Sequence, residues 1–416
     1  MKKLRNMLAL AMVLLVLVSA VSGCSSSGES DRKETEKQTA AGGTSEGTEA
    51  SGQTEASQEA GGAETAWGIE PMSEPVTISL GFFSGSPHSS EFYIMEQMGW
   101  TEELGITFEY NSFISGPAMM EANADWDLCT TGGPGVINGI LNYDVKAIGI
   151  VENEKMLYLY VREDSPIAQA GKGHFADYPE MYGTAEDWKG TEWLLPVGTT
   201  MHMTLVSVLE QIGLTADDVV MTNMDATTAL TGFRAGEGDG MGIWTSTAIE
   251  AEGDGKYVKV AGADDNGVVI AAAMCATDAA LSDPLKREAI QKLYELYYRT
   301  AEWREENMEE AATLFAETCA IEGVTPTEDY DLAYEIYKRT KDHTLAQNME
   351  LMLNSAADEA GLAGREITGG EQAILYTFDF FVSQDKYTNE QRDFILDNNK
   401  ITSEIAEEVQ AIIDAR

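Results

Sequence analysis

Basic side chains and cysteines are scarce in this sequence of 416 residues. It holds 27 Lys and Arg against 70 Asp and Glu, which gives a formal net charge of −43. Because nucleic-acid affinity depends on Lys and Arg at phosphates, we exclude DNA and RNA as partners. Cys129, Cys275 and Cys319 are an odd, scattered set in apolar contexts, so we expect buried thiols and not a disulfide framework.

Motifs of enzyme active sites are also missing. The sequence has no HExxH, no GxSxG, no Walker loop and no cysteine pair at metal-ligand spacing, and its four histidines are dispersed. Carboxylates are so abundant that no pair of them is informative. We therefore expect a protein that is not an enzyme and that has no catalytic residues, no cofactor and no metal.

One apolar run, at residues 7–18, lies between the basic start MKKLRN and the small residues before Cys24. It is too short to cross a bilayer comfortably, so residues 1–23 are predicted to be a secretory signal peptide. Gly23, Cys24 and the serines after them resemble the bacterial lipobox, which implies that Cys24 is diacylated and becomes the mature N-terminus. Such a chain is held at the extracytoplasmic face of the cell membrane. The alternative is an ordinary signal peptide with a chance cysteine.

Residues 24–75 are rich in Ser, Gly, Thr, Glu, Ala and Gln, with almost no aliphatic residues except near their end. Such a segment cannot bury enough apolar surface to offset the entropy that it loses on ordering. We expect a lipid-anchored flexible linker with an r.m.s. reach of roughly 35–45 Å.

From Val76 onward, short apolar runs alternate with helix signals, a pattern typical of an α/β fold with a parallel-type sheet and helices on its faces. The length is enough for two lobes. We predict a first part of lobe 1 at residues 76–162, lobe 2 at 163–265, and a return to lobe 1 with C-terminal helices at 266–416. The chain is expected to cross between the lobes at about 157–162 and 268–275.

Residues 191–214 show most clearly how a binding site would arise. A strand at 192–197 leads through Gly198 and Thr199 into an amphipathic helix, with Thr200 as the expected N-cap. A helix start at the carboxyl end of a parallel strand offers N–H groups and a positive dipole end to a small polar or anionic group. The alternative is an ordinary connection without a ligand. Similar helix starts at Ser86, Gly132 and Thr245 make this alternative less favoured.

The order of these motifs resembles a known family. GPAMMEA, DWDLCTTGGPGVINGI, DWKGTEWLLPVGTTMHMTLVSVLEQIGL and GFRAGEGDGMGIWTSTA are similar to segments of the solute-binding proteins of nitrate, sulfonate and taurine ABC importers. The resemblance covers residues 76–275 and implies the two-lobe type II periplasmic-binding-protein fold, which closes on a small-molecule solute and delivers it to the permease subunits of the transporter. We expect a monomer. Residues 166–183 depart from the family as an apparent insertion.

Geometry and resemblance together place the strand ends of both lobes at the ligand. Backbone N–H groups and hydroxyls are expected to hold a polar head, Phe83 and Trp244 to cover an apolar or planar part, and His88 and His202 to supply positive charge if they face the solute. No arginine lies in these turns, which favours a monoanion or a neutral polar molecule over a dianion. The predicted ligand-binding residues are Phe83, Ser84, Ser86, His88, Thr131, Gly132, Gly133, Gly198, Thr199, Thr200, His202, Trp244 and Thr245.

Two other functions are compatible with the sequence. A tethered sensory or adhesive lipoprotein would share the lipobox and the linker. A binding protein or enzyme related to thiamine-pyrimidine synthesis would share the fold, but its cysteine-rich motif does not match the cysteines here.

Overall fold

The computed structural model describes residues 65–83, 85–268, 270–318 and 330–340, together with Thr377, Phe378, Phe381, Thr388 and Gln391. The chain divides into two compact units, residues 1–61 and 62–416, and all described residues belong to the second. The predicted signal peptide, Cys24, most of the predicted linker, Ser84, Cys319 and nearly all of the helices predicted after residue 345 lie outside the described residues.

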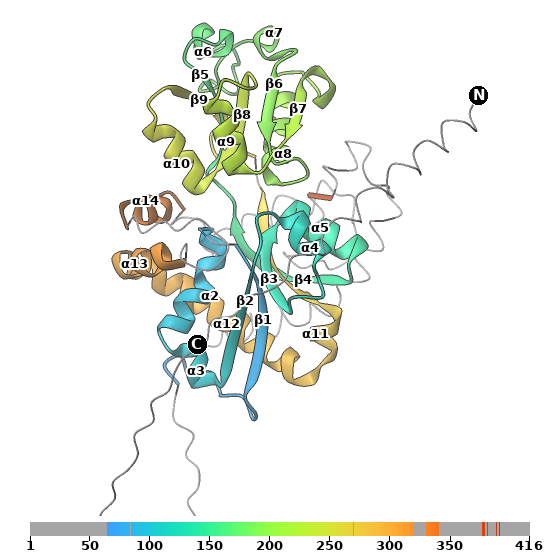
Figure 1. Ribbon diagram of the computed structural model, residues 1–416, viewed down its shortest axis with the longest axis vertical. Coiled ribbons are helices and arrows are strands. Elements are labelled where there is room, and N and C mark those ends of the chain that lie inside the picture. Colours follow the sequence, from blue (N-terminus) through green and yellow to red (C-terminus); the bar gives the residue numbers. More distant parts are fainter. Residues whose placement is uncertain are drawn as a thin grey trace, which may run out of the picture. The chain divides into compact units, whose positions relative to one another are not determined.

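The first lobe is built on a five-stranded sheet in the order β2-β1-β3-β10-β4 (Figure 1). β1 pairs in parallel with β2 and β3, whereas β10 is antiparallel to both of its neighbours, β3 and β4. The strands are β1 (Val76–Phe82), β2 (Ile106–Ser112), β3 (Leu128–Gly132), β4 (Val145–Asn153) and β10 (Ala271–Thr277).

The second lobe has its own five-stranded sheet, in the order β7-β6-β8-β5-β9. Its strands are β5 (Leu157–Arg162), β6 (Glu192–Leu195), β7 (Val220–Asn223), β8 (Gly240–Trp244) and β9 (Tyr257–Gly262). The sequence placed β5 at the end of the first lobe, but this strand pairs antiparallel with β8 and β9 and so belongs to the second sheet. The sequence predicted parallel-type sheets, but β5 and β10, the strands that follow the two crossings, are antiparallel to their neighbours.

Helices surround both sheets. The first lobe contains α2 (Pro87–Gln97), α3 (Trp100–Leu104), α4 (Gly116–Glu121), α5 (Gly133–Asn142), α11 (Asp278–Ser282), α12 (Pro284–Glu306) and α13 (Met308–Thr318). The second contains α6 (Pro166–Ala170), α7 (Ala185–Trp188), α8 (Thr200–Gln211), the short 3-10 helix η1 (Ala216–Asp218), α9 (Ala226–Arg234) and α10 (Thr245–Gly253). α14 (Tyr330–Thr340) packs on α13 and also contacts α10.

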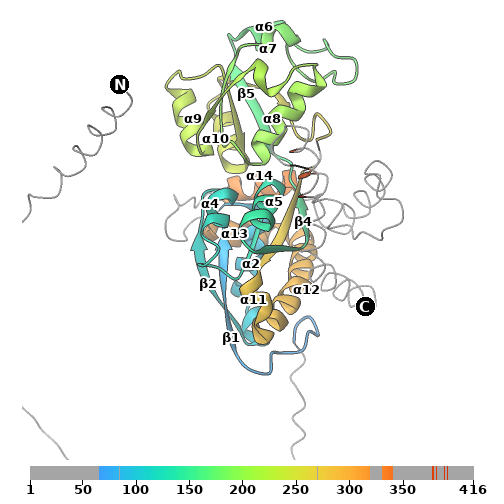
Figure 2. The same cartoon turned by 90° about the vertical axis from the view of Figure 1, so that its right-hand side faces the viewer.

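Successive side chains along β5 and along β10 point into two different hydrophobic clusters, so each sheet is covered on both faces. Leu157 and Leu159 of β5 pack with residues of α8, whereas Tyr158 and Tyr160 face the cluster that holds α9 and α10. Figure 2 shows α8 and α9 on opposite sides of this sheet. In β10, Cys275 lies beside Cys129 of β3, and both are buried thiols as expected.

Residues 65–75 fold onto the first lobe, although the sequence placed them in the flexible linker. Trp67 packs edge-on against Trp100 with ring centroids 5.0 Å apart, and Ile69 and Met72 are buried. These are the aliphatic and aromatic residues near the end of the polar segment, and their burial offsets the entropy cost of ordering it. None of the helices in the described ranges combines the length and apolar character needed to cross a bilayer.

Candidate functional site

Four helices start directly after strands, and they carry most of the predicted site. α2 follows β1, α5 follows β3, α8 follows β6 and α10 follows β8. The N-cap residues of three of them, Ser86, Gly132 and Trp244, make no side-chain hydrogen bond to the first turn. The cap side chains therefore do not satisfy the first N–H groups of these helices; in α2 the Ser89 N–H donates to the Ser86 carbonyl oxygen instead.

The helix α8 begins one residue earlier than the sequence suggested. Thr199, not Thr200, is the N-cap, since its backbone is still extended and its Oγ1 accepts from the Met201 N–H at 3.3 Å. The same hydroxyl donates to the carbonyl oxygen of Pro196 at 2.6 Å. Gly198 has a left-handed φ of 82°, and its N–H donates to Nδ1 of His202 at 3.2 Å. The turn is thus closed by its own residues.

Because Thr199 caps the helix, the Thr200 side chain has another use. It forms a hydrogen bond with the carboxyl group of Glu154, which lies between β4 and β5. A Cβ atom at Gly132, the N-cap of α5, would overlap with both Glu154 Oε1 and Thr200 Cγ2. Only glycine permits this approach, so the starts of α5 and α8 meet at Glu154.

The two segments that cross between the sheets are also joined at this point. The Glu154 N–H donates to the carbonyl oxygen of Ile270 at 2.7 Å, and the Met156 carbonyl accepts from the Thr245 N–H at 3.2 Å. Met156 and Thr245 have positive φ values of 26° and 39°, which are unfavourable for residues with a Cβ atom. Backbone strain is therefore concentrated where the first crossing touches the start of α10.

Other predicted glycines pack closely in the first lobe. A Cβ atom at Gly135 would lie 2.7 Å from Oγ1 of the buried Thr131, and one at Gly133 would overlap with the side chain of Thr377. The glycine run at the start of α5 therefore serves close packing as well as helix initiation.

Comparison with known proteins shows which fold this arrangement of strands and helices has. The periplasmic nitrate-binding protein NrtA from Synechocystis PCC 6803 superimposes with a TM-score of 0.58 at 10% identity, over 83% of this chain and 91% of that protein. The alkanesulfonate-binding protein SsuA from Xanthomonas axonopodis pv. citri, solved with MOPS bound, gives 0.57 at 17% identity, over 76% and 96%. The chain has the fold of these periplasmic solute-binding proteins. The resemblance seen in the sequence is thus confirmed at the level of the fold.

Sequence comparison adds a relative among curated proteins. A protein from Brachyspira hyodysenteriae, provisionally named an ABC transporter periplasmic binding protein, is 29% identical over 160 residues, or 38% of this chain. The match spans about half of that protein, 46% of its length. No family model matches the chain.

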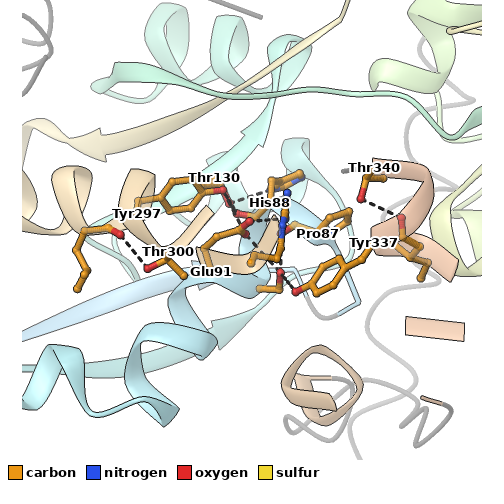
Figure 3. A network of polar contacts seen from close by, with 12 residues as sticks. Pro87, His88, Glu91, Thr130, Tyr297, Thr300, Tyr337 and Thr340 are labelled. Carbon is orange, nitrogen blue, oxygen red and sulfur yellow. Dashed lines mark hydrogen bonds and ion pairs between the residues drawn. The ribbon is translucent and has the colours of Figure 1, made fainter. Parts of the chain in front are cut away.

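Within the solute-binding fold, His88 does not provide the positive charge that the sequence suggested. It is only 8% exposed, and its Nδ1 lies 2.9 Å from Oγ1 of Thr130 (Figure 3). Burial lowers the pKa of His88 more than the nearby Glu152 carboxylate raises it, so the ring is neutral at pH 7. The Tyr297 hydroxyl donates to the His88 carbonyl at 2.7 Å, which fixes the start of α2.

A buried polar network also holds α2 in place. Glu91 of α2 forms an ion pair with Arg304 of α12, and both side chains are buried (Figure 3 shows Glu91). Arg304 also lies over the ring of Tyr337 at 4.9 Å, and the Tyr337 hydroxyl is 2.6 Å from Ser90 Oγ. Removing one partner of such a pair costs about 3–5 kcal/mol because it leaves a buried charge. The network therefore holds α2 rigidly against α12 and α14.

The electrostatic environment at the meeting point is acidic. Burial, followed by repulsion from Glu152, raises the pKa of Glu154 to about 8, while the Thr200 hydrogen bond lowers it. Glu152 is itself 6% exposed. No group of His, Cys, Asp or Glu side chains in the described segments is arranged to hold a metal ion.

The remaining predicted residues lie in two places. Phe83 is half-buried with its ring edge-on to His88 at 5.9 Å, on the first-lobe side. Trp244 is half-buried in the second lobe, where it pairs with Leu157. The structure brings together Gly132, Thr200 and Thr245 around the first crossing. Glu154 was missed because nothing in its local sequence distinguishes it from the other acidic residues.

Proposed function

We propose that this protein is an extracytoplasmic, lipid-anchored solute-binding protein of an ABC importer. It captures a small polar or anionic solute of the nitrate, sulfonate or taurine class between its two lobes and delivers it to the permease. The contact of Gly132 and Thr200, from helix starts of different lobes, with Glu154 of the crossing carries this proposal. The starts of one helix from each lobe meet here, and we propose that a solute bridges the lobes at this point.

Movement of the lobes would follow from the same geometry. The segment between β4 and β5 and the segment between β9 and β10 join the two sheets, and the Glu154 to Ile270 hydrogen bond links them. A hinge needs a few residues that absorb changes in φ and ψ, and the strained Met156 is suited to this. A solute that contacts both lobes would then favour the closed state by its differential affinity.

Native mass spectrometry of the purified protein tests the binding role, and we expect a bound small molecule. Closure is tested with spin labels on Glu121→Cys in the first lobe and Asp217→Cys in the second, both exposed positions. Adding the identified solute to stripped protein should shorten the mean distance between the labels. An unchanged distance with a tightly bound solute would remove the closing mechanism.

The membrane anchor is tested separately. Cys24→Ala should leave the protein unprocessed or release it from the membrane fraction, because the acylated thiol would be lost. Metabolic labelling with a fatty acid gives the readout, and Ser25→Ala is the matched control that should label normally. Labelling of Cys24→Ala at the level of the parent would contradict the anchor.

A further inference from the structure

The helix α14 is attached to the first lobe. Its Tyr337 ring stacks on Phe315 of α13 with ring centroids 4.6 Å apart, and the Tyr337 hydroxyl lies 2.6 Å from Ser90 Oγ of α2 (Figure 3 shows Tyr337). The guanidinium group of Arg304, from α12, lies over the same ring. All three partners come from first-lobe helices, and Tyr337 is buried. We therefore expect α14 to move with the first lobe.

Two residues further along α14, Arg339 binds the second lobe. Its Nη1 and Nη2 donate to Oε1 and Oε2 of Glu252 in α10 at 3.0 and 2.9 Å, so the ion pair is bidentate. Glu252 Oε1 also accepts from the Tyr160 hydroxyl of β5 at 2.9 Å. Arg339 Nε donates to Glu335 of its own helix at 2.9 Å. Each member of the pair is thus oriented by a neighbour in its own lobe.

This ion pair connects the lobes at a distance from the two crossings. Thr245, the first residue of α10, bonds to Met156 of the first crossing, whereas Glu252 lies about 10 Å further along the helix at a rise of ~1.5 Å per residue. A turn of roughly 15° about the crossings, perpendicular to α10, would move Glu252 by about 2–3 Å. The two bonds to Arg339 would then be too long, and the bond to Glu335 limits how far Arg339 can follow.

We propose that Arg339 and Glu252 form a latch that holds the two lobes in the arrangement seen here, and that this latch opens when the second lobe turns about the crossings. The lobes then exchange between a latched and an unlatched arrangement, and the ion pair sets the ratio of the two populations. This inference concerns the movement of the lobes and depends neither on the identity of a solute nor on its presence.

An ion pair within one lobe provides a matched control. Arg234 of α9 is also bidentate, since its Nε and Nη2 donate to Asp254 at 2.7 and 3.0 Å, and its Nη1 donates to Glu250 of α10. Arg234 and Arg339 therefore both bind carboxylates at the C-terminal part of α10. Because α9 and α10 belong to the same lobe, reversing the charge of Arg234 removes an ion pair of α10 without changing the contact between the lobes.

The test measures the distance between spin labels on Glu121→Cys and Asp217→Cys, at exposed positions of the two lobes, in the full chain freed of bound small molecules. Arg339→Glu places two carboxylates opposite each other. A second distance should appear, shifted by a few Å, and the ratio of latched to unlatched protein should fall at least about 3-fold. Adding Glu252→Arg to this variant should restore most of the parent distance, because the charges are again opposite. Arg234→Glu should keep the parent distance.

A second variant keeps the test decisive if Arg339→Glu does not fold. Glu252→Gln leaves α14 unchanged and retains an acceptor for Tyr160, and it should give the same second distance at a lower population. In the folded variants, a single distance equal to that of the parent would overturn the latch. A second distance that persists after Glu252→Arg is added, or that also appears in Arg234→Glu, would overturn it as well, because the change would not come from this pair. Absence of a bound solute in mass spectrometry would remove the proposed function and leave the latch standing.

Discussion

Two adjacent threonines at the start of α8 have different partners, and this difference can be measured. In Thr199→Val the helix loses its N-cap acceptor, and the buried carbonyl of Pro196 loses its donor. An N-cap contributes about 1 kcal/mol, and an unsatisfied buried polar group costs about 1–3 kcal/mol. We therefore expect the free energy of unfolding to fall by roughly 2–4 kcal/mol.

The matched variant Thr200→Val makes the same change in shape one residue later. Its side chain bonds to Glu154, which keeps part of its surface exposed, and it caps nothing. The free energy of unfolding should fall by less than about 1 kcal/mol. Solute affinity should change instead, because the contact between Glu154 and α8 is lost.

Urea unfolding followed by near-ultraviolet circular dichroism provides the measurement. The stacked rings of Trp188 and Trp193, 5.0 Å apart with an interplanar angle of 16°, give a signal that depends on the packing of the second lobe. Equal losses of stability in Thr199→Val and Thr200→Val, or a larger loss in Thr200→Val, would refute the assignment of the cap.

Two further predictions concern the meeting point of the lobes. Gly132→Ala should weaken solute binding, since the new Cβ atom displaces Glu154. The Cβ atom of Gly198→Ala meets open space, so this variant should lose only about 1–2 kcal/mol of stability through backbone strain. Solute affinity and the free energy of unfolding are measured for both variants, and equal losses of affinity would contradict the prediction. Without ligand, the free energy of unfolding should fall as pH rises from about 4.5 to about 8, because the folded chain holds a proton on Glu154 that the unfolded chain has released. Urea titrations at several pH values should show a shallower dependence of this free energy on pH in Glu154→Gln.

Local signals in the sequence located many element boundaries correctly. Ser86 before Pro87, Asp225 before α9, and the bounds of α12 all follow from short-range capping rules. The strand Gly240–Trp244 is an apolar run that begins at glycine, which is likewise a local feature. The order of these units was enough to identify the fold.

Features that depend on contacts distant in sequence were predicted less well. Thr199 and Thr200 are the same residue type at neighbouring positions, and only the backbone angles show which one caps α8. The sheet that receives β5 is decided by its hydrogen bonds to β8 and β9. Glu154 acquires its environment only when α5, α8 and the second crossing come together, so no local pattern distinguishes it.

The packing of Trp67 against Trp100 has a mechanical consequence. The described chain enters the folded unit through residues 65–75, which pack on the first lobe, and it passes into and out of the second sheet through the two crossings. A force applied through residues before 65 is therefore borne by the first lobe and does not pass through the strained Met156. Tension on the preceding chain is thus not transmitted to the second sheet along the backbone of the first crossing.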